Sequence, residues 1–326
     1  MQGKVLPGQS AGMRVYVGID VCKERLDVYL HPIGQTLSVD NSKQGIKRLK
    51  KELAGFDIAL VTVEATSKYH CDVHRALSEC GISVAVVNPL RPRLFAEAIG
   101  ELAKTDAIDA RILAMFGAMT ELDATPVMSV ELEELKEIVR TRQQAVEDQT
   151  AVKNRLGACK LKFLKRELER QLVSMEKGIV RLEGEIQRRI KADIQLRRRF
   201  KILCSIPGIG HMTAAVLITG MSELGACSGK AAALLAGLAP IARDSGEKEG
   251  KRHIKGGRRF VRQALYMASL TAARWNPALK AFYNHLIAKY PKKYALTAVM
   301  RKLVVLANTL IKEDRLWEPQ RPLPNH

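Results

Sequence analysis

The chain has 326 residues, of which 47% are hydrophobic, so it can bury at least one full core and form two or three domains. Lysine and arginine number 53 against 34 acidic residues, and the formal net charge of +19 predicts a polyanionic partner, with nucleic acid as the first candidate. No run of about 20 apolar residues could span a bilayer, and residues 1–13 lack the apolar core of a signal peptide. We therefore expect a cytoplasmic protein with no membrane partner. The six cysteines show no CxxC pair and no zinc spacing, which predicts free thiols.

Residues 14–125 predict an α/β domain of the ribonuclease H-like class. Three β-rich runs at 14–20, 26–30 and 36–39 are separated by short connections and predict an antiparallel meander. A basic amphipathic helix over 42–54 and a buried strand over 58–63 follow. We then expect a helix at 69–80, a strand at 83–87, and helices at 92–98 and 106–119. A meander followed by alternating helices and strands is typical of that fold.

Four carboxylates fall at positions that this topology brings together. Asp20 ends the first strand and Glu64 ends the fourth, so both are expected at one edge of the sheet. Asp106 and Asp109 lie in the first turn of a helix with Thr105 as its N-cap, and residues at i and i+3 share a helix face. Four such acids would repel one another unless cations neutralised them. The pattern therefore predicts a two-metal phosphoryl-transfer site that binds Mg²⁺ or Mn²⁺.

Each acid also has an ordinary structural explanation. Acids in a first helical turn complement the helix dipole, which explains Asp106 and Asp109 without any metal. Asp20 could be a turn residue at a strand end, and Glu64 could simply be solvated. The predicted convergence of all four favours the site over these separate explanations.

Residues 126–200 predict a helical segment, since no proline occurs between Pro126 and Pro207. Apolar residues recur with the 4-3 spacing of a coiled-coil seam, at Leu168, Leu172, Met175, Ile179, Leu182 and Ile186. The segment could be one long helix or a helical hairpin, with Gly157 as a break. We expect it to pair with another chain as a dimerisation element. A helical bundle within one chain is the alternative.

The segment Ile206-Pro207-Gly208-Ile209-Gly210 opens a helix of small residues and resembles a helix-hairpin-helix motif. Glycines such as Gly208 and Gly210 would let backbone N–H groups at the helix start approach a nucleic-acid phosphate. A plain helix–turn–helix connection is the other explanation.

A long loop over 243–259 is rich in glycine and strongly basic, and it lies between helical segments. Such a loop inside a folded domain is usually functional. Ser245 is its only serine, and nearby cations could offset phosphate charge while its hydroxyl attacks. The alternative is an ordinary serine that caps a turn. The cations expected to bind nucleic acid are Lys248, Lys251, Arg252, Lys255, Arg258, Arg259 and Arg262.

Helices are expected over 260–273, 279–290 and 294–312, and they complete a mostly helical domain over 201–314. Residues 315–326 contain three prolines and are expected to be disordered, as are residues 1–13.

Taken in order, these motifs resemble the DEDD-type insertion-sequence transposases, the bacterial family numbered one hundred and ten. The resemblance covers residues 14–312. Its motifs are Gly18-Ile19-Asp20 with Lys23, Val63-Glu64-Ala65-Thr66, Lys104-Thr105-Asp106 with Asp109-Ala110-Arg111, Ile206-Pro207-Gly208-Ile209-Gly210, Gly237-Leu238-Ala239-Pro240, and Ser245-Gly246. The chain departs from the family at Ser67, where many relatives have glycine, and at residues 253–257, where the loop is shortened.

The resemblance implies a RuvC-like domain, a coiled-coil middle and a C-terminal transposase domain. It implies that Asp20, Glu64, Asp106 and Asp109 form the acidic tetrad and that Ser245 is a nucleophile. Lys23, Lys104 and Arg111 would be phosphate neighbours of the tetrad. The resemblance also implies a structured non-coding guide RNA of the bridge type, which pairs with donor and target DNA, and a homo-oligomer that is a dimer or larger in the synaptic complex.

The expected function is a DNA transposase or recombinase. A hydrolytic RuvC-like nuclease, such as a junction resolvase, would use the same tetrad with water as the nucleophile. A non-catalytic nucleic-acid-binding scaffold would use the basic loop and the hairpin motif alone, and its binding would be sensitive to salt.

Overall fold

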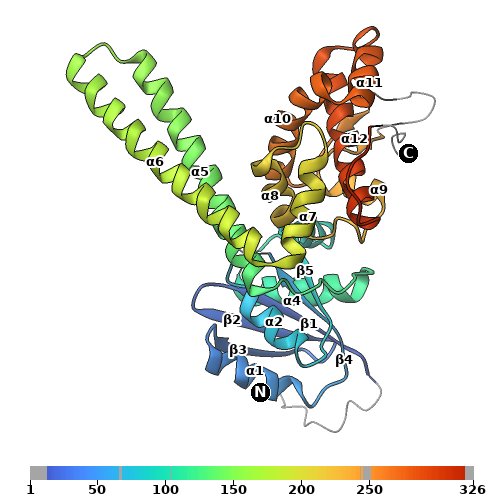
Figure 1. Cartoon of the computed structure of the whole chain (residues 1–326). Helices are drawn as coiled ribbons and strands as arrows, with labels where there is room; N and C mark the ends of the chain where they lie inside the picture. Colours follow the sequence, from blue (N-terminus) through green and yellow to red (C-terminus); the bar gives the residue numbers. More distant parts are fainter. Residues whose placement is uncertain are drawn as a thin grey trace. The chain divides into compact units, whose positions relative to one another are not determined.

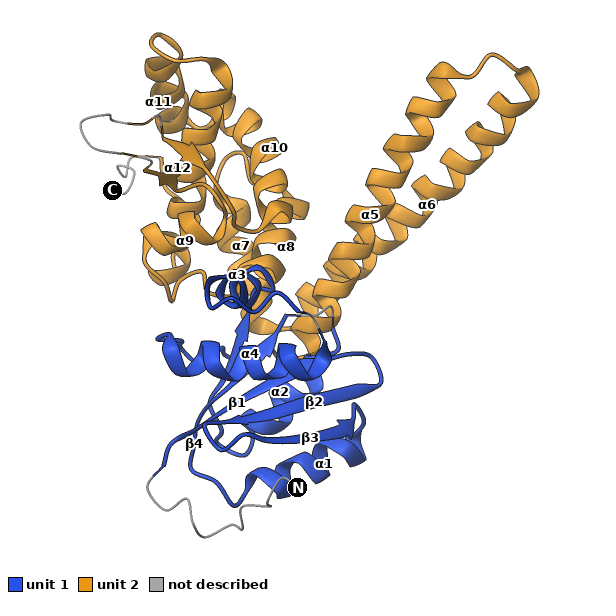
Figure 2. Ribbon diagram, turned by 180° about the vertical axis from the view of Figure 1, so that it is seen from behind, with its two compact units in different colours: residues 1–128 blue, residues 129–326 orange. Residues whose placement is uncertain are grey.

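The computed structural model describes residues 13–65, 68–103, 105–242, 244, 250 and 252–319. Most of the two terminal segments expected to be disordered lies outside the described residues. So do four of the predicted site residues, Lys104, Ser245, Lys248 and Lys251. The chain divides into two compact units, Met1–Met128 and Ser129–His326 (Figure 2).

Unit 1 is built on a five-stranded mixed sheet of order β3-β2-β1-β4-β5. The strands are β1 (Val15–Val21), β2 (Arg25–His31), β3 (Gln35–Asp40), β4 (Ile58–Glu64) and β5 (Val84–Val87). The first three pair antiparallel through short turns, whereas β4 and β5 run parallel to β1. A meander followed by parallel strands is the arrangement that the sequence predicts, and the sheet fits a ribonuclease H-like fold.

Helices cover both faces of this sheet (Figure 1). On one face, α1 (Lys43–Leu53) and α2 (Cys71–Ser78) pack on the apolar side chains of β1, among them Val17 and Ile19, and form the main core of unit 1. On the other face lies α4 (Asp106–Met119), with α3 (Leu90–Ala98) beside it. The alternation of side chains along a strand therefore decides which residues of β1 meet α4.

Two glycines let α4 lie directly on the sheet. A Cβ atom at Gly18 of β1 would stand 2.0 Å from the carbonyl oxygen of Ala110 and 2.4 Å from the amide nitrogen of Ala114. Near the other end of the helix, a Cβ atom at Gly117 would stand 2.3 Å from Oγ1 of Thr62 on β4. Backbone can approach backbone this closely only where a glycine is present. The first of these contacts fixes where α4 begins relative to β1.

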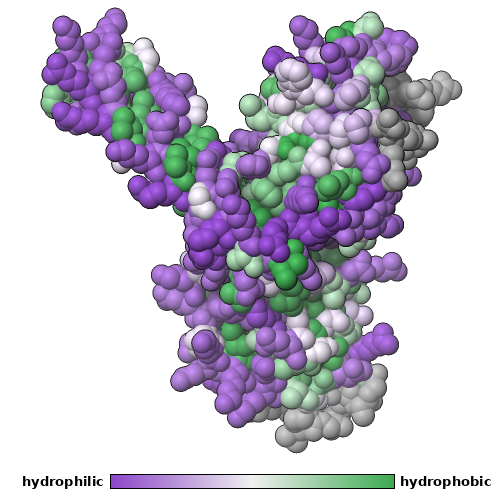
Figure 3. All heavy atoms as spheres, in the orientation of Figure 1, coloured by the Kyte–Doolittle hydropathy of each residue, from purple (hydrophilic) through white to green (hydrophobic). Residues whose placement is uncertain are grey.

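Unit 2 begins with a helical hairpin of α5 (Val130–Ala158) and α6 (Lys162–Ala192). The hairpin turns at residues 159–161, and Gly157 lies inside α5 rather than at the break. The seam is buried at Ile179 and Ile186, but several large apolar side chains on the hairpin are exposed, as the green patches in Figure 3 show. The exposed ones include Phe163, Val173 and Val180.

The body of unit 2 is a helical bundle around one large apolar core. Its helices are α7 (Ile194–Ser205), α8 (His211–Gly220), α9 (Gly229–Leu235), α10 (Arg259–Trp275), α11 (Pro277–Ile287) and α12 (Lys292–Lys312). A short ribbon of β6 (Pro240–Ile241) and β7 (His253–Ile254) closes the base of the glycine-rich loop. The body also holds part of the C-terminal segment, because Leu316 and Trp317 pack against the core.

The sequence analysis expected no apolar run long enough to span a bilayer, but helix α12 is such a run by length and composition. Among the described residues it is the one helix long and apolar enough by composition, with a mean hydropathy of 1.4 over its most apolar window. Of that window, 61% is buried, and its side chains belong to the core of unit 2. The apolar character of α12 is therefore explained by packing.

Candidate active site

Asp20 and Glu64 lie side by side at the carboxyl ends of two neighbouring parallel strands. The register of β1 with β4 pairs Gly18 with Thr62 and Ile19 with Val63, so the next residues in line are Asp20 and Glu64. Asp20 shares a face of β1 with Gly18, because side chains alternate along a strand. That face is the one on which α4 lies, so both carboxylates belong to the α4 side of the sheet.

Helix α4 brings the other two acids to the same place. Its N-cap is Thr105, whose hydroxyl accepts a hydrogen bond from the Ile108 N–H at 3.3 Å. Asp106 and Asp109 form the acidic first turn that this cap begins. Ala110, which directly follows Asp109, is the residue that rests on Gly18. The close contact at Gly18 therefore sets the first turn of α4 beside the end of β1.

The electrostatics of Asp20 show that the four carboxylates interact. The pKa of Asp20 is raised to about 6, mainly by burial and then by the negative charges of Asp109, Asp106 and Glu64, in that order of effect. Like charges shift a pKa upward only when they lie close together. The four acids expected from the sequence are thus neighbours in unit 1, and their role as a metal-binding tetrad stays a prediction.

Two residues that the sequence analysis did not single out belong to this cluster. Asp27 of β2 pairs directly with Asp20 across the antiparallel ladder, which adds a fifth carboxylate to the face. Arg25 donates from Nε to Oδ2 of Asp27 at 2.8 Å and from Nη2 to Oδ2 of Asp106 at 2.6 Å. Arg25 is therefore the cation that offsets part of the negative charge. The sequence holds a signal for Asp27. If the turn between the first two strands is two residues long, at 23–24, antiparallel pairing puts Asp27 opposite Asp20, and the two side chains then lie on the same face of the sheet.

The acidic cluster has the donor chemistry of a divalent-ion site but not the geometry. Its donors are all carboxylate oxygens, the ligand type that Mg²⁺ prefers. Among the described residues, however, no group of three or more acids, histidines or cysteines is close enough to hold an ion. Arg25 takes up an oxygen of Asp106 that a metal would need. The donor chemistry of the site fits a metal, and the carboxylates would have to close around it.

The cations expected to flank the tetrad have different surroundings. Lys23 is exposed in the turn between β1 and β2. Arg111 forms an ion pair with Glu101, so its positive charge is already neutralised by a neighbouring carboxylate. Lys104 lies outside the described residues. Of these three, Lys23 is left as the exposed cation that the structure describes beside the end of β1.

In unit 2 the structure describes the base of the glycine-rich loop but not Ser245. Strands β6 and β7 pair in antiparallel register, and the backbones of Gly237 and Gly257 touch so closely that a Cβ on Gly257 would lie 2.1 Å from the Gly237 amide nitrogen. Asp244 accepts hydrogen bonds from Gly250 N–H at 3.0 Å and from Arg252 Nη1 at 2.7 Å. The residue before Ser245 is therefore tied to the far side of the loop.

Several of the predicted nucleic-acid-binding cations have partners inside unit 2. Arg258 donates to both carboxylate oxygens of Glu223 and, at 2.8 Å, to the Gly220 carbonyl. Burial alone would raise the pKa of Glu223, but the hydrogen bonds from Arg258 outweigh it and hold that pKa below its usual value. Arg262 donates to the Gly256 carbonyl at 2.7 Å, and Arg252 pairs with Asp244. Of the predicted cations that the structure describes in this loop, Arg252, Lys255 and Arg259 are exposed, and Arg252 is the one paired with Asp244.

The two glycines of the hairpin motif differ in their surroundings. Gly208 has φ of 108°, and a Cβ there would lie 2.5 Å from Cβ of Ala272 on α10, so packing within unit 2 already requires glycine. Gly210 is the N-cap of α8 and has no atom within 4 Å of where a Cβ would stand. Gly210 is therefore the position of the two where a phosphate could approach the backbone.

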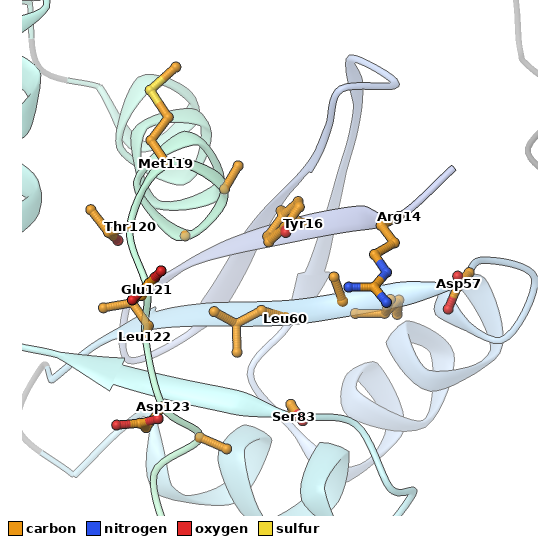
Figure 4. A pocket seen from close by; sticks show the side chains of 15 residues that line it. Arg14, Tyr16, Asp57, Leu60, Ser83, Met119, Thr120, Glu121, Leu122 and Asp123 are labelled. Carbon is orange, nitrogen blue, oxygen red and sulfur yellow. The ribbon is translucent and has the colours of Figure 1, made fainter. Parts of the chain in front are cut away.

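A pocket of about 780 Å³ lies in unit 1 but away from the tetrad (Figure 4). Tyr16 and Leu60 line it near the starts of β1 and β4, and residues 119–124, from the last residue of α4 onward, also line it. Asp20 and Glu64 lie at the opposite ends of the same two strands. The pocket therefore contributes nothing to the acidic cluster.

Comparisons with known proteins give this arrangement a context. Residues 17–163 match the DEDD transposase family model of insertion sequence IS110, and residues 200–284 match the transposase family model named for IS116, IS110 and IS902. The first match contains all four tetrad acids, and the second contains both the hairpin motif and the glycine-rich loop.

Similar proteins include one that covers almost the whole chain. The pilin gene-inverting protein of Moraxella bovis is 27% identical over 317 residues, which are 94% of this chain and 98% of the relative. A 43.6 kDa protein of insertion element IS110 from Streptomyces coelicolor is 26% identical over 42% of this chain and 35% of its own length. A probable family 20 transposase of Pseudomonas aeruginosa is 22% identical over 80% of this chain and 86% of the relative.

Proposed function

Because the chain belongs to the IS110 family of transposases, whose members cut and rejoin DNA, we propose that it is a Mg²⁺-dependent recombinase with a serine nucleophile. The observation that carries the proposal is the assembly of Asp20, Glu64, Asp106 and Asp109 at one edge of the unit 1 sheet. The likeness to a pilin gene-inverting protein over 94% of the chain supports site-specific recombination.

The tetrad is the group that would hold the metal, and DEDD transposase domains typically use a divalent ion. When bound, Mg²⁺ or Mn²⁺ supplies a positive charge that stabilises the negative charge developing on the scissile phosphate. A bound cation would favour the ionised form of Asp20, which burial and three like charges oppose. Arg25 would release Asp106 as the site fills, and it would then be free to contact a DNA phosphate. Lys23 would contact the backbone of the same strand.

Ser245 is the proposed nucleophile. Its Oγ forms a bond to phosphorus while a phosphorus–oxygen bond of the DNA strand breaks, and the departing oxygen takes up the serine proton. The cut strand is then held as a phosphoserine until the hydroxyl end of a second strand displaces the serine. Asp244 supports this assignment, because its bonds to Gly250 and Arg252 tether the loop immediately beside Ser245. Arg252 would also be close to the phosphate.

Specificity is proposed to come from a structured guide RNA of the element. The net charge of +19 suits a protein that holds RNA and two DNA partners at once. Base pairing would select the donor and target, while the protein reads backbone and shape, as in other guided systems. Gly210, Lys255 and Arg259 are positions where the fold leaves backbone or charge available for phosphate contacts.

The helical hairpin is proposed as the dimerisation element. It carries exposed apolar side chains such as Phe163 and Val180, which a coiled-coil partner would cover. The tetrad and Ser245 belong to different units of the chain. The two would have to meet in space, either within one chain or across a dimer built on the coiled coil.

A hydrolytic nuclease is the second candidate, and one observation favours it: the complete tetrad lies in unit 1, so cleavage by water would not need Ser245. Both candidates predict metal-dependent cleavage, which the scaffold alternative does not. The first experiment incubates wild-type protein, copurified RNA and both DNA partners with and without Mg²⁺. We expect cleavage only with Mg²⁺ and none from Asp20→Asn. Cleavage by Asp20→Asn at the wild-type rate would refute the metal site.

A further inference from the structure

Two exposed tyrosines stack on each other at the corner between α11 and α12. The ring centroids of Tyr290 and Tyr294 are 4.7 Å apart, the ring planes meet at 29°, and the residues are 47% and 50% exposed. Backbone bonds hold the corner, since Tyr290 N–H donates to Leu286 O and Tyr294 N–H donates to Pro291 O, both at 2.9 Å. The rings are therefore held as a preformed stack on the surface of unit 2.

Lysines surround this stack without acidic neighbours in sequence. Lys289, Lys292 and Lys293 are all exposed, and residues 250–312 contain no aspartate or glutamate. Lys292 and Lys293 lie in the first turn of α12, where the helix dipole disfavours cations and no acid offsets them. These lysines therefore lower the stability of the helix that carries them, and their charge is left for a partner.

We propose that the Tyr290–Tyr294 stack is a binding site for a single-stranded segment of nucleic acid. An unpaired base continues the stack on an exposed ring face, and the three lysines contact the phosphates on either side. A duplex does not suit the site, because its base faces are already covered by neighbouring pairs. Aromatic stacking suits any base, so the site would hold an unpaired strand without reading its sequence. The inference rests on the proposed function only in taking nucleic acid as the partner.

The test uses full-length protein in EDTA, so that the tetrad takes no part. Fluorescence anisotropy compares a labelled oligo(dT) of about 12 nucleotides with an abasic strand of equal length, which carries the same phosphates but no bases. We expect wild type to bind oligo(dT) about tenfold more tightly, since stacking contributes on that scale. The Tyr290→Ala, Tyr294→Ala double variant should lose this preference, and the matched Tyr→Phe double variant should keep it. Equal affinity of wild type for both strands would overturn the proposal.

The lysines are tested separately. Replacing Lys289, Lys292 and Lys293 with alanine should weaken binding of both strands alike and reduce the salt dependence of binding. The control replaces three exposed lysines of α1, Lys43, Lys47 and Lys51, which removes the same net charge from unit 1. An equal loss in both triple variants would show that net charge alone is measured, and it would contradict a site at this corner.

Photo-crosslinking locates the contact without any variant. Oligonucleotides that carry 5-iodouracil should crosslink to peptides containing Tyr290 or Tyr294, and crosslinks found only elsewhere would overturn the assignment. Vesicles containing phosphatidylserine provide the other partner class, since exposed tyrosine and lysine also suit a lipid surface. If the double alanine variant lost binding to vesicles but bound oligonucleotides as wild type does, the corner would be assigned to lipid instead. Asp20→Asn should keep the strand preference, so a failure of the catalytic proposal is distinguishable from a failure of this one.

Discussion

Gly18 of β1 and Ala110 of α4 touch backbone to backbone, and this contact sets the distance between the two halves of the acidic tetrad. A Cβ at Gly18 would lie 2.0 Å from the Ala110 carbonyl oxygen, a separation that real Cβ atoms essentially never show. Asp20 follows Gly18 by two residues, and Asp109 directly precedes Ala110. Any side chain at position 18 must push the first turn of α4 away from the end of β1.

Gly18→Ala should therefore impair activity and stability together. We expect a loss of about 2 kcal/mol or more in the free energy of unfolding, because the neighbouring atoms are backbone and cannot move aside. Displacing Asp106 and Asp109 should lower Mg²⁺-dependent cleavage about 10²-fold. Gly157→Ala is the control, since Gly157 lies in a helix with open space around it and alanine should stabilise slightly. Wild-type cleavage and melting temperature in Gly18→Ala would contradict the contact.

Arg25 should compete with the metal for Asp106. Its Nη2 lies 2.6 Å from Oδ2 of Asp106, and an exposed ion pair of this kind is weak enough for a divalent ion to displace. Arg25→Ala should therefore lower the Mg²⁺ concentration for half-maximal cleavage about two- to fivefold, whereas Arg25→Lys should change it less. The measurement is a Mg²⁺ titration of the cleavage rate. An unchanged or higher half-saturating concentration in Arg25→Ala would show that the pair does not oppose the metal.

Asp20→Asn should stabilise the protein in the absence of metal. Burial and three like charges raise the pKa of Asp20 from 3.8 to about 6, so the folded state binds more protons than the unfolded state between those pH values. The stability contribution of this group is full below pH 3.8 and is lost as pH rises through 6. At pH 7 the variant should gain about 1 kcal/mol over wild type, a figure reduced because Asp20 is partly exposed.

The measurement for Asp20 is the free energy of unfolding in EDTA at pH 4 and pH 7, followed by the addition of Mg²⁺. The advantage of Asp20→Asn should vanish near pH 4, and Mg²⁺ should stabilise wild type but not the variant. A variant that is less stable than wild type at pH 7 without metal would mean that the carboxylate is already neutralised in the fold.

Arg258 and Arg259 are adjacent in sequence but should have different roles. Arg258→Ala removes the hydrogen bonds to Glu223 and Gly220, so unit 2 should lose about 1–2 kcal/mol of stability. Arg259 is exposed, so Arg259→Ala should leave the melting temperature unchanged while it lowers the salt dependence of DNA binding by about one phosphate contact. Calorimetry measures the melting temperature of each variant, and a salt titration measures the salt dependence of its DNA binding. Equal effects of both variants on stability would contradict the assignment.

Most elements of unit 1 could be predicted from local pattern. The strands and helices follow the expected ranges, because strand alternation, the N-cap at Thr105 and the short connections of the meander depend on a few neighbouring residues. The neighbouring positions of Asp20 and Glu64 were predictable for the same reason, since they lie at the carboxyl ends of parallel neighbouring strands. Their role in a tetrad stays a prediction.

The roles of several individual residues could not be predicted, because they depend on contacts between residues far apart in the sequence. Arg25 could not be assigned to the site without the β1–β2 register, which puts Asp27 opposite Asp20. Arg258 was predicted to bind nucleic acid like the other cations of the loop. Its partner, Glu223, lies 35 positions away in sequence, so local pattern does not reveal the ion pair. Similarly, Gly208 fits a phosphate-binding hairpin in sequence, whereas in the fold it packs on Ala272 of α10.

The most direct test of the catalytic account is to trap a covalent protein–DNA adduct. Wild-type protein with copurified RNA and both DNA partners is quenched in denaturant and resolved on a gel, beside Ser245→Ala and Asp20→Asn. The account predicts a Mg²⁺-dependent adduct for wild type alone, with the modified peptide containing Ser245. Efficient cleavage by Ser245→Ala without any adduct in wild type would contradict the serine nucleophile and favour hydrolysis by the tetrad.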